Sequence, residues 1–236
     1  MITPLKRAAL LLTTTLLVLT AASPAGAEPY RPAASAAAYS AGAQPRTLSL
    51  AAAVAVLPPA AESRAGYERT SFKHWNAGRI PSDGCNTRAE VLLAEAVEAP
   101  EVAPGCKLSG GRWWSYYDAR WITSASALDI DHMVPLAEAW DSGASQWTAE
   151  RREAYANDQG ADTSLVAVSA ASNRSKSDQD PADWLPTAVE STCRYTAEWV
   201  ATKLRWGLTV DTTEDDALAR IAEGCPTTTV TYDPAA

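Results

Sequence analysis

Four cysteines that follow an apolar N-terminal stretch constrain the fold of this 236-residue chain more than any other feature of its sequence. The N-terminus has two cations, Lys6 and Arg7, then the apolar stretch over residues 10–20, and then the small-residue motif Ala25-Gly26-Ala27. This order is typical of a signal peptide with its cleavage site. We therefore predict that residues 1–27 are a signal peptide, that the mature chain begins at Glu28, and that it is secreted to the extracellular space without a membrane anchor.

An even number of cysteines in an oxidising compartment predicts disulfides. Four cysteines allow three pairings, and we favour Cys85–Cys106 with Cys193–Cys225, because each bond closes a loop of a few tens of residues around a predicted helix. Each bond of this kind contributes about 3 kcal/mol to the free energy of unfolding.

The composition excludes several classes of protein. The 28 acidic residues exceed the 20 basic ones, which gives a net charge of -8, or -10 once Lys6 and Arg7 leave with the signal peptide. Such a chain is not a general polyanion binder. Its two histidines, His74 and His132, are too few for a three-histidine zinc site, and no two cysteines are spaced as CxxC. Zinc proteases, zinc ribbons and thioredoxin-type redox motifs are thereby excluded.

The pattern of residues predicts one α+β domain. Residues 28–47 are rich in Ala, Pro and Ser and read as a linker or pro-segment, and residues 48–236 read as the domain. We expect helices that begin near Thr87, Thr148 and Thr212 or Thr213, another helix within residues 188–206, and strands at 113–117, 127–135 and 165–168. The segment 127–185 then reads as strand, helical insertion, strand, and a polar loop into a helix.

Two segments carry residues suited to phosphodiester chemistry. The first is Asp129-Ile130-Asp131-His132-Met133-Val134-Pro135, and the second is Asn173-Arg174-Ser175-Lys176-Ser177-Asp178. Carboxylate and amide oxygens suit a hard divalent cation, a histidine can act as a base, and Arg and Lys suit phosphate. In a regular strand Asp131 and His132 would point to opposite faces, so they can share a site only where the strand ends.

The ordered pair of segments resembles the HNH, or ββα-metal, endonucleases. More closely, residues 66–225 resemble secreted HNH proteins related to the C-terminal domain of GmrSD-type restriction endonucleases. The matching segments are Gly66-Tyr67-Glu68-Arg69, Asp83 to Arg88, Ile130 to Leu136, Ser169 to Pro181 and Trp184-Leu185-Pro186. This resemblance implies a ββα-metal core with surrounding helices, stapled by disulfides.

The resemblance also implies roles for individual residues. His132 would be the general base, and Asp131 and Asn173 would complete the catalytic set by holding one divalent cation, Mg²⁺ by expectation, with Mn²⁺ or another cation as alternatives. Arg174 and Lys176 would bind the substrate backbone, and Arg88 would contact phosphate or brace the site. The substrate would be DNA, with RNA left open, cleaved with little sequence specificity by a monomer. Many HNH sequences have a middle asparagine that pins a loop; here Asn157 or a serine hydroxyl, such as that of Ser164, could take that part, or no residue takes it.

The nine tryptophans support an alternative function. Trp113-Trp114 and Tyr116-Tyr117 could stack on sugars, and paired carboxylates could hydrolyse a glycosidic bond. The alternative is a secreted carbohydrate-active hydrolase or a carbohydrate-binding module. It leaves the pair of Asp131-His132 with Asn173-Arg174-Ser175-Lys176 unexplained. His74 is expected to be structural.

Overall fold

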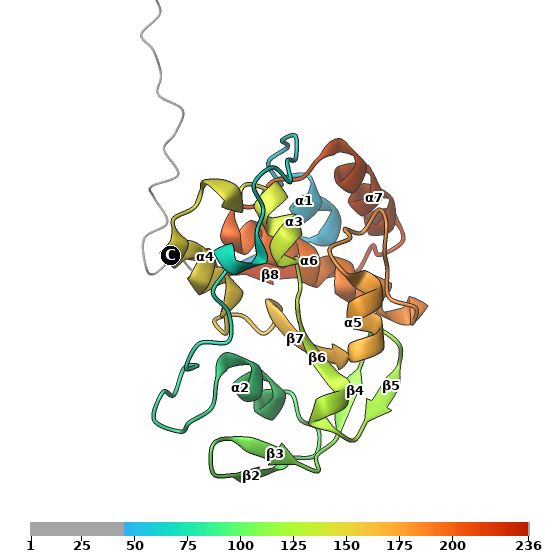
Figure 1. Ribbon diagram of the computed structural model, residues 1–236. Coiled ribbons are helices and arrows are strands. Elements are labelled where there is room, and N and C mark those ends of the chain that lie inside the picture. The colour runs from blue at the N-terminus through green and yellow to red at the C-terminus, as the bar shows by residue number, and fades with distance from the viewer. Residues whose placement is uncertain (1–44, 236) are drawn as a thin grey trace, which may run out of the picture. The chain divides into compact units, whose positions relative to one another are not determined.

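The computed structural model describes residues 45–235, so the predicted signal peptide and nearly all of the predicted linker lie outside the described residues. Mostly short helices and strands make up this part of the chain (Figure 1). In order they are β1 (Arg46–Ser49), α1 (Leu50–Val54), α2 (Thr87–Ala94), β2 (Glu101–Ala103), β3 (Lys107–Ser109), β4 (Trp113–Ser115), β5 (Arg120–Ile122), β6 (Leu128–His132), α3 (Leu136–Asp141), α4 (Ala149–Ala156), β7 (Leu165–Ser169), α5 (Ala170–Lys176), α6 (Thr192–Trp206), α7 (Thr212–Glu223) and β8 (Thr229–Tyr232). No helix among residues 45–235 is both long and apolar enough to cross a bilayer.

The strands form four antiparallel pairs, each of two strands: β1 with β8, β2 with β3, β4 with β5, and β6 with β7. Such short pairs are not stable alone and depend on helices packed against them. The β6–β7 pair lies between the α1, α6, α7 group and the α2, β2–β3 group (Figure 1). The mixed helix and strand content agrees with the predicted α+β class.

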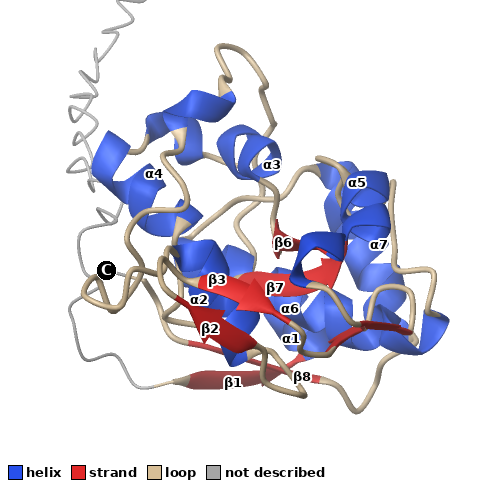
Figure 2. Cartoon of the chain, turned by 60° about the horizontal axis from the view of Figure 1, so that its bottom comes forward, coloured by secondary structure: helices blue, strands red, loops and turns tan. Residues whose placement is uncertain are grey.

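Helix α6 is the centre of the larger core. It packs against β8, α1 and α7, and its side chains Tyr195, Trp199 and Val200 have no exposed surface. The helix ends where its pattern predicts, because Gly207 takes the left-handed conformation with φ +66° and ψ +35° that an αL cap needs. Figure 2 shows α6 and α1 beneath the β6–β7 pair.

Helix starts follow the predicted segments, but two of the capping residues differ. Thr148 caps α4 as expected, by accepting a hydrogen bond from the Arg151 amide. Helix α2 is capped by Asn86 rather than Thr87, and α7 by Asp211 rather than Thr212 or Thr213. In both corrections an Asn or Asp lies one or two residues earlier and is the stronger N-cap, so it takes the position.

The order strand, helical insertion, strand is found in segment 127–185, but the polar loop is absent. Strand β6 is followed by α3 and α4, then by β7, and α5 begins directly after Ser169. Ser169 caps this helix by accepting from the Ser172 amide, so Asn173 to Lys176 are helical and the chain leaves the helix only at Ser177. The prediction of a loop failed because this cap lies inside an apolar strand pattern, where a serine gives little signal.

The two predicted disulfides are confirmed. Cys85–Cys106 joins the segment before α2 to the turn of the β2–β3 hairpin, and Cys193–Cys225 joins the first turn of α6 to the end of α7. The second bond holds together two helices of the main core. The first holds a peripheral hairpin that has few buried side chains of its own.

The outer edge of β7 is covered by side chains instead of another strand. Glu95 accepts a hydrogen bond from the Ala167 amide at 2.9 Å, and the Ser115 hydroxyl accepts one from the Ser169 amide at 2.9 Å. These contacts satisfy backbone donors that would otherwise be unpaired at an edge. Burial raises the pKa of Glu95 to about 7; the charges of Glu198 and Asp162 add to the rise, and the hydrogen bond from Ala167 and the charge of Arg194 oppose it.

This raised pKa predicts how Glu95→Gln changes stability with pH. The folded chain binds a proton at Glu95 more tightly than the unfolded chain, so the stabilisation is present below pH 4.5 and is lost as the pH rises to about 7. Glutamine keeps an acceptor for Ala167 without the charge. We expect the free energy of unfolding of the variant to be higher than that of the native chain by about 1–3 kcal/mol at pH 8 and equal to it near pH 4.5. Urea unfolding at the two pH values measures this, and an equal gain at both would contradict it.

Candidate functional site

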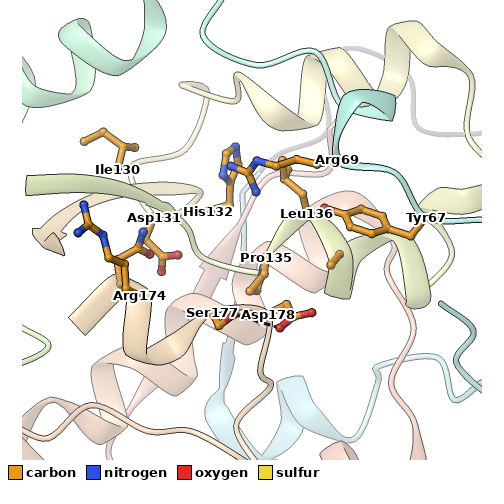
Figure 3. Close-up of a pocket in the computed structure, with 12 residues that line it drawn as sticks. Tyr67, Arg69, Ile130, Asp131, His132, Pro135, Leu136, Arg174, Ser177 and Asp178 are labelled. Carbon is orange, nitrogen blue, oxygen red and sulfur yellow. Dashed lines mark hydrogen bonds between the residues drawn. The ribbon is translucent and has the colours of Figure 1, made fainter. Parts of the chain in front are cut away.

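A cavity of about 480 Å³ opens where β6 ends. Its walls come from the segment around the 3₁₀ turn η1 (Arg69–Ser71), from the end of β6, from the start of α3 and from α5 (Figure 3). The lining residues include Tyr67, Arg69, Asp131, His132, Leu136, Asn173, Arg174 and Asp178. The structure thus brings together four of the predicted site residues, Asp131, His132, Asn173 and Arg174.

His132 is the last residue of β6, where the strand ends and Asp131 and His132 can share one cavity. Its ring is stacked between Trp75, at a centroid distance of 5.4 Å, and Tyr155, at 6.4 Å. Nε2 lies 2.9 Å from the Ala156 carbonyl oxygen, which can only accept, so Nε2 carries the hydrogen and Nδ1 is the basic nitrogen. Burial lowers the pKa of His132 to about 3, which keeps the ring neutral.

The carbonyl that orients His132 is held in place by its neighbour, Asn157. The Asn157 amide donates to the carbonyls of Lys73 and Glu153, both at 2.8 Å. Its oxygen accepts from the Asn76 amide at 3.0 Å and from the Thr87 hydroxyl at 2.9 Å. Asn157 therefore joins three separate segments at the end of α4.

Ser164 was the other candidate for the loop-pinning role of the middle asparagine. Its hydroxyl instead donates to Asp158 at 2.6 Å. Of the two alternatives left open by the sequence, only Asn157 makes the bonds that fix the loop beside His132. Three of the four hydrogen bonds of Asn157 were not visible in the sequence, because their partners lie in distant segments.

Asp131 is buried and shares its Oδ2 atom between two donors. Tyr117 donates its hydroxyl at 2.6 Å, and the ammonium of Lys176 forms an ion pair with the same oxygen. Burial raises the pKa of Asp131 and lowers the pKa of Lys176, and the contact between the two charges opposes both shifts.

The position of Lys176 corrects its predicted role as a phosphate ligand. Its side chain has no exposed surface, and the ammonium also donates to the carbonyls of His132, at 3.1 Å, and Met133, at 2.8 Å. All three of its donors are used within the protein, so Lys176 positions the end of β6 and does not reach the cavity. The prediction missed this because its short motif does not reveal the aromatic side chains that enclose the lysine.

Asn173 and Lys176 lie three residues apart on α5, hence on the same side of the helix. Asn173 lines the cavity, and its Nδ2 atom faces Asp129 at 3.4 Å, so the carbonyl oxygen Oδ1 is directed away from Asp129. The neighbouring Arg174 is exposed and pairs with Asp129 at 3.3 Å. Asp129 is thus an accessory group that orients both residues.

Arg88 and Arg69 take roles different from those that the sequence predicted. Arg88 donates to the carbonyls of Ala125, at 3.2 Å, and Leu128, at 2.9 Å, and is not among the cavity residues. Of its two predicted roles, phosphate contact is therefore corrected and bracing of the strand remains. Arg69 was given no role, yet it is exposed and extends beside His132 (Figure 3). Its place in the segment Gly66-Tyr67-Glu68-Arg69 was the available signal.

Comparison with known proteins agrees with this site. Residues 90–221 match the family model of the GmrSD restriction endonucleases, C-terminal domain. The chain belongs to this family. The predicted relation to GmrSD-type enzymes is confirmed, and it places the chain in a nuclease family in general terms. The matched residues contain β6, β7 and α5, hence Asp131, His132 and Asn173.

A relative from Arthroderma benhamiae is described as an uncharacterized secreted protein. It is 38% identical over 161 residues, which cover 68% of this chain and 76% of the relative. Together with the two disulfides, this match confirms the prediction that the GmrSD-related chain is secreted. No solved structure matches the chain.

The burial of Lys176 generates a stability prediction. Lys176→Met leaves the Asp131 carboxylate buried without its cation, so we expect the free energy of unfolding to fall by about 3–5 kcal/mol. Urea unfolding followed by tryptophan fluorescence measures the change. The matched control is Arg174→Met on the same helix, which should change stability by less than about 0.5 kcal/mol because its side chain is 76% exposed. Equal effects of the two variants would contradict the positioning role.

Proposed function

We propose that this protein is a secreted, metal-dependent endonuclease that hydrolyses phosphodiester bonds of DNA with little sequence specificity. The single observation that carries the proposal is the meeting of His132, Asp131 and Asn173 in one cavity, with exposed arginines at its rim. In this proposal residues 1–27 are the signal peptide and residues 48–236 are the catalytic domain, which acts as a monomer.

The donor atoms fit a hard divalent cation. Asp131 keeps its Oδ2 atom for Tyr117 and Lys176, which leaves Oδ1 for the cavity, and Asn173 directs its amide nitrogen to Asp129, which leaves its carbonyl oxygen. Oxygen ligands of this kind suit Mg²⁺, with Mn²⁺ as an alternative. A cation held there would bind a phosphate oxygen and stabilise the charge that develops on the leaving oxygen.

His132 is oriented to act as a general base. The Ala156 carbonyl fixes the hydrogen on Nε2, and Trp75 and Tyr155 hold the plane of the ring, so Nδ1 is the nitrogen that accepts a proton from water. The neutral state favoured by burial keeps this nitrogen available. Asn157 acts through the Ala156 carbonyl and is a positioning residue.

Exposed cations supply the contacts to the substrate backbone. Arg174 pairs with Asp129, whose side chain is partly exposed. The guanidinium of Arg174 is 76% exposed, so a phosphate can compete with Asp129 for it. Arg69, on the opposite wall, is a second candidate. These local groups compensate for the net charge of -8, which gives no general attraction to DNA.

The arrangement of elements supports an HNH-type core. Antiparallel β6 and β7 are followed at once by α5, which packs against both strands. The base lies at the end of the first strand and Asn173 lies in the helix. This is the ββα order that the HNH resemblance implies, with α3 and α4 as an insertion between the strands.

The carbohydrate alternative loses most of its proposed sugar-binding residues. Trp113, Tyr116 and Tyr117 are at most 5% exposed, so they pack in the core and cannot stack on a sugar. Trp114 stays 39% exposed, but it is in contact with Trp121 at a centroid distance of 5.0 Å and lines no wall of the His132 cavity.

The proposal predicts cation-dependent cleavage of nucleic acid. Oxidised protein of residues 28–236 should nick and linearise supercoiled plasmid in Mg²⁺ or Mn²⁺, and EDTA should abolish the cleavage because Asp131 and Asn173 alone do not stabilise the leaving oxygen. Agarose gels follow the reaction, with single-stranded DNA and RNA run in parallel. Lack of cleavage of every substrate, across several cations and pH values, would reject the proposal.

The roles of the two site residues can be separated. His132→Ala should lower the cleavage rate by roughly 10²–10⁴-fold and retain cation binding, because the base is not a ligand. Asn173→Ala should weaken cation binding, measured by calorimetry. The matched control for the first variant is His74→Ala, whose ring lies 6.3 Å from His132 but is not among the cavity residues. Loss of the cation in His132→Ala would reverse the assignment.

A further inference from the structure

A second group of oxygen ligands lies at α3, outside the residues that line the cavity of His132. Glu138 and Asp141 belong to this helix, and Glu62 comes from the segment that links α1 to η1. One carboxylate oxygen from each residue lies within 4.8 Å of the other two. None of the three residues lines the cavity of His132.

The separations of these oxygens, each at most 4.8 Å, leave room for a calcium ion. Calcium binds oxygens at about 2.3–2.6 Å, so two ligands on opposite sides of the ion are about 4.6–5.2 Å apart. Magnesium needs shorter distances and near-ideal octahedral geometry. Three carboxylates whose oxygens are all within 4.8 Å of one another can thus be bridged by one ion of calcium's size.

The group is removed from solvent, which makes its negative charge costly. Glu138 is 3% exposed, the Asp141 side chain is 7% exposed, and Glu62 is half-buried. The Ser142 hydroxyl joins the two glutamates, with Oγ–Oε1 distances of 2.8 Å to Glu138 and 3.3 Å to Glu62. A buried carboxylate needs a cation or a proton, because burial penalises its charge.

The cations beside the group do not balance it. Lys203 pairs with Glu138 at 3.0 Å, but it is shared with the equally buried Glu214. Arg64 pairs with Asp141 at 2.6 Å, but it is shared with Asp178. With every group ionised, the set holds five carboxylates, Glu62 included, against two cations, and a divalent ion would remove most of this excess.

An unpaired oxygen marks this place as a binding position. Oδ1 of Asp141 is buried and has no hydrogen-bond partner, although Oδ2 of the same carboxylate is paired with Arg64. Buried carboxylate oxygens are normally satisfied, and one that finds no donor within the protein is suited to an ion or a water. This unpaired atom belongs to a side chain of the three-carboxylate group.

We infer that Glu62, Glu138 and Asp141 form a second cation site, which takes one divalent ion of the size of Ca²⁺. The ion fastens the segment before η1 to α3. That segment continues into Tyr67 and Arg69, so the ion also fixes one wall of the cavity. Its role is structural, and the inference does not depend on the proposed nuclease activity.

The test is thermal unfolding of the oxidised chain with and without CaCl₂, at constant ionic strength. We expect the melting temperature to rise by roughly 5–10 °C at a calcium concentration about 100 times the Kd. Calorimetry should show one calcium ion bound, and Asn173→Ala should retain this response because it alters only the other site. An absent response in the native chain would overturn the inference and leave a proton as the occupant, since burial and Glu138 raise the pKa of Glu62 to about 8.

Glu62→Gln is the decisive variant. It removes one ligand charge without altering Glu138, which also holds Lys203. We expect calcium affinity to fall roughly tenfold or more, because calcium affinity follows the number of charged ligands. The matched control is Glu223→Gln, an exposed glutamate at the end of α7, which should respond as the native chain does. If Glu62→Gln fails to fold, Asp141→Asn replaces it. A native response in a folded ligand variant, or a lost response in Asn173→Ala, would overturn the inference.

Discussion

A single buried ammonium group holds the candidate site together. Lys176 donates to the Asp131 carboxylate and to two successive carbonyls at the end of β6, and so fixes the strand at the point where it turns. The rings of Tyr117, Tyr195 and Trp199 surround it at 5.6–5.8 Å. Removal of either charge would leave the other buried and unpaired in this enclosure. The Lys176–Asp131 pair is therefore tightly constrained, even though its net contribution to stability is small.

The two sides of the His132 ring are built by different parts of the chain. Helix α4, within the insertion between β6 and β7, contributes Tyr155 and the Ala156 carbonyl, and the segment before α2 contributes Trp75. Trp75 has φ +61°, a conformation that costs energy for a residue other than glycine and that persists only where packing imposes it. Asn157 joins the two parts. The insertion between β6 and β7 therefore contributes directly to the site.

The sequence predicted what depends on local chemistry. Capped helices, the strand that ends at His132, both disulfides and the residues that meet in the cavity follow from short patterns and from the resemblance they carry. The burial of Lys176 could not be predicted, because it depends on rings from the segment after β4 and from α6 that approach only in the folded chain. The four hydrogen bonds of Asn157 and the position of Arg69 beside His132 likewise depend on the folded chain, although Asn157 was a candidate from its sequence position. Arg174 and Lys176 are two residues apart and give similar signals in the sequence, yet Lys176 is enclosed and Arg174 is exposed.

The pairing of β1 with β8 sets when the fold can be completed. Arg46 lies opposite Tyr232, and α6, which supplies two of the rings around Lys176, packs on β8. Contacts between such distant segments form late, since the intervening chain must first be brought together. A chain without residues 229–232 would therefore leave β1 without its partner strand and α6 without the strand pair on which it packs.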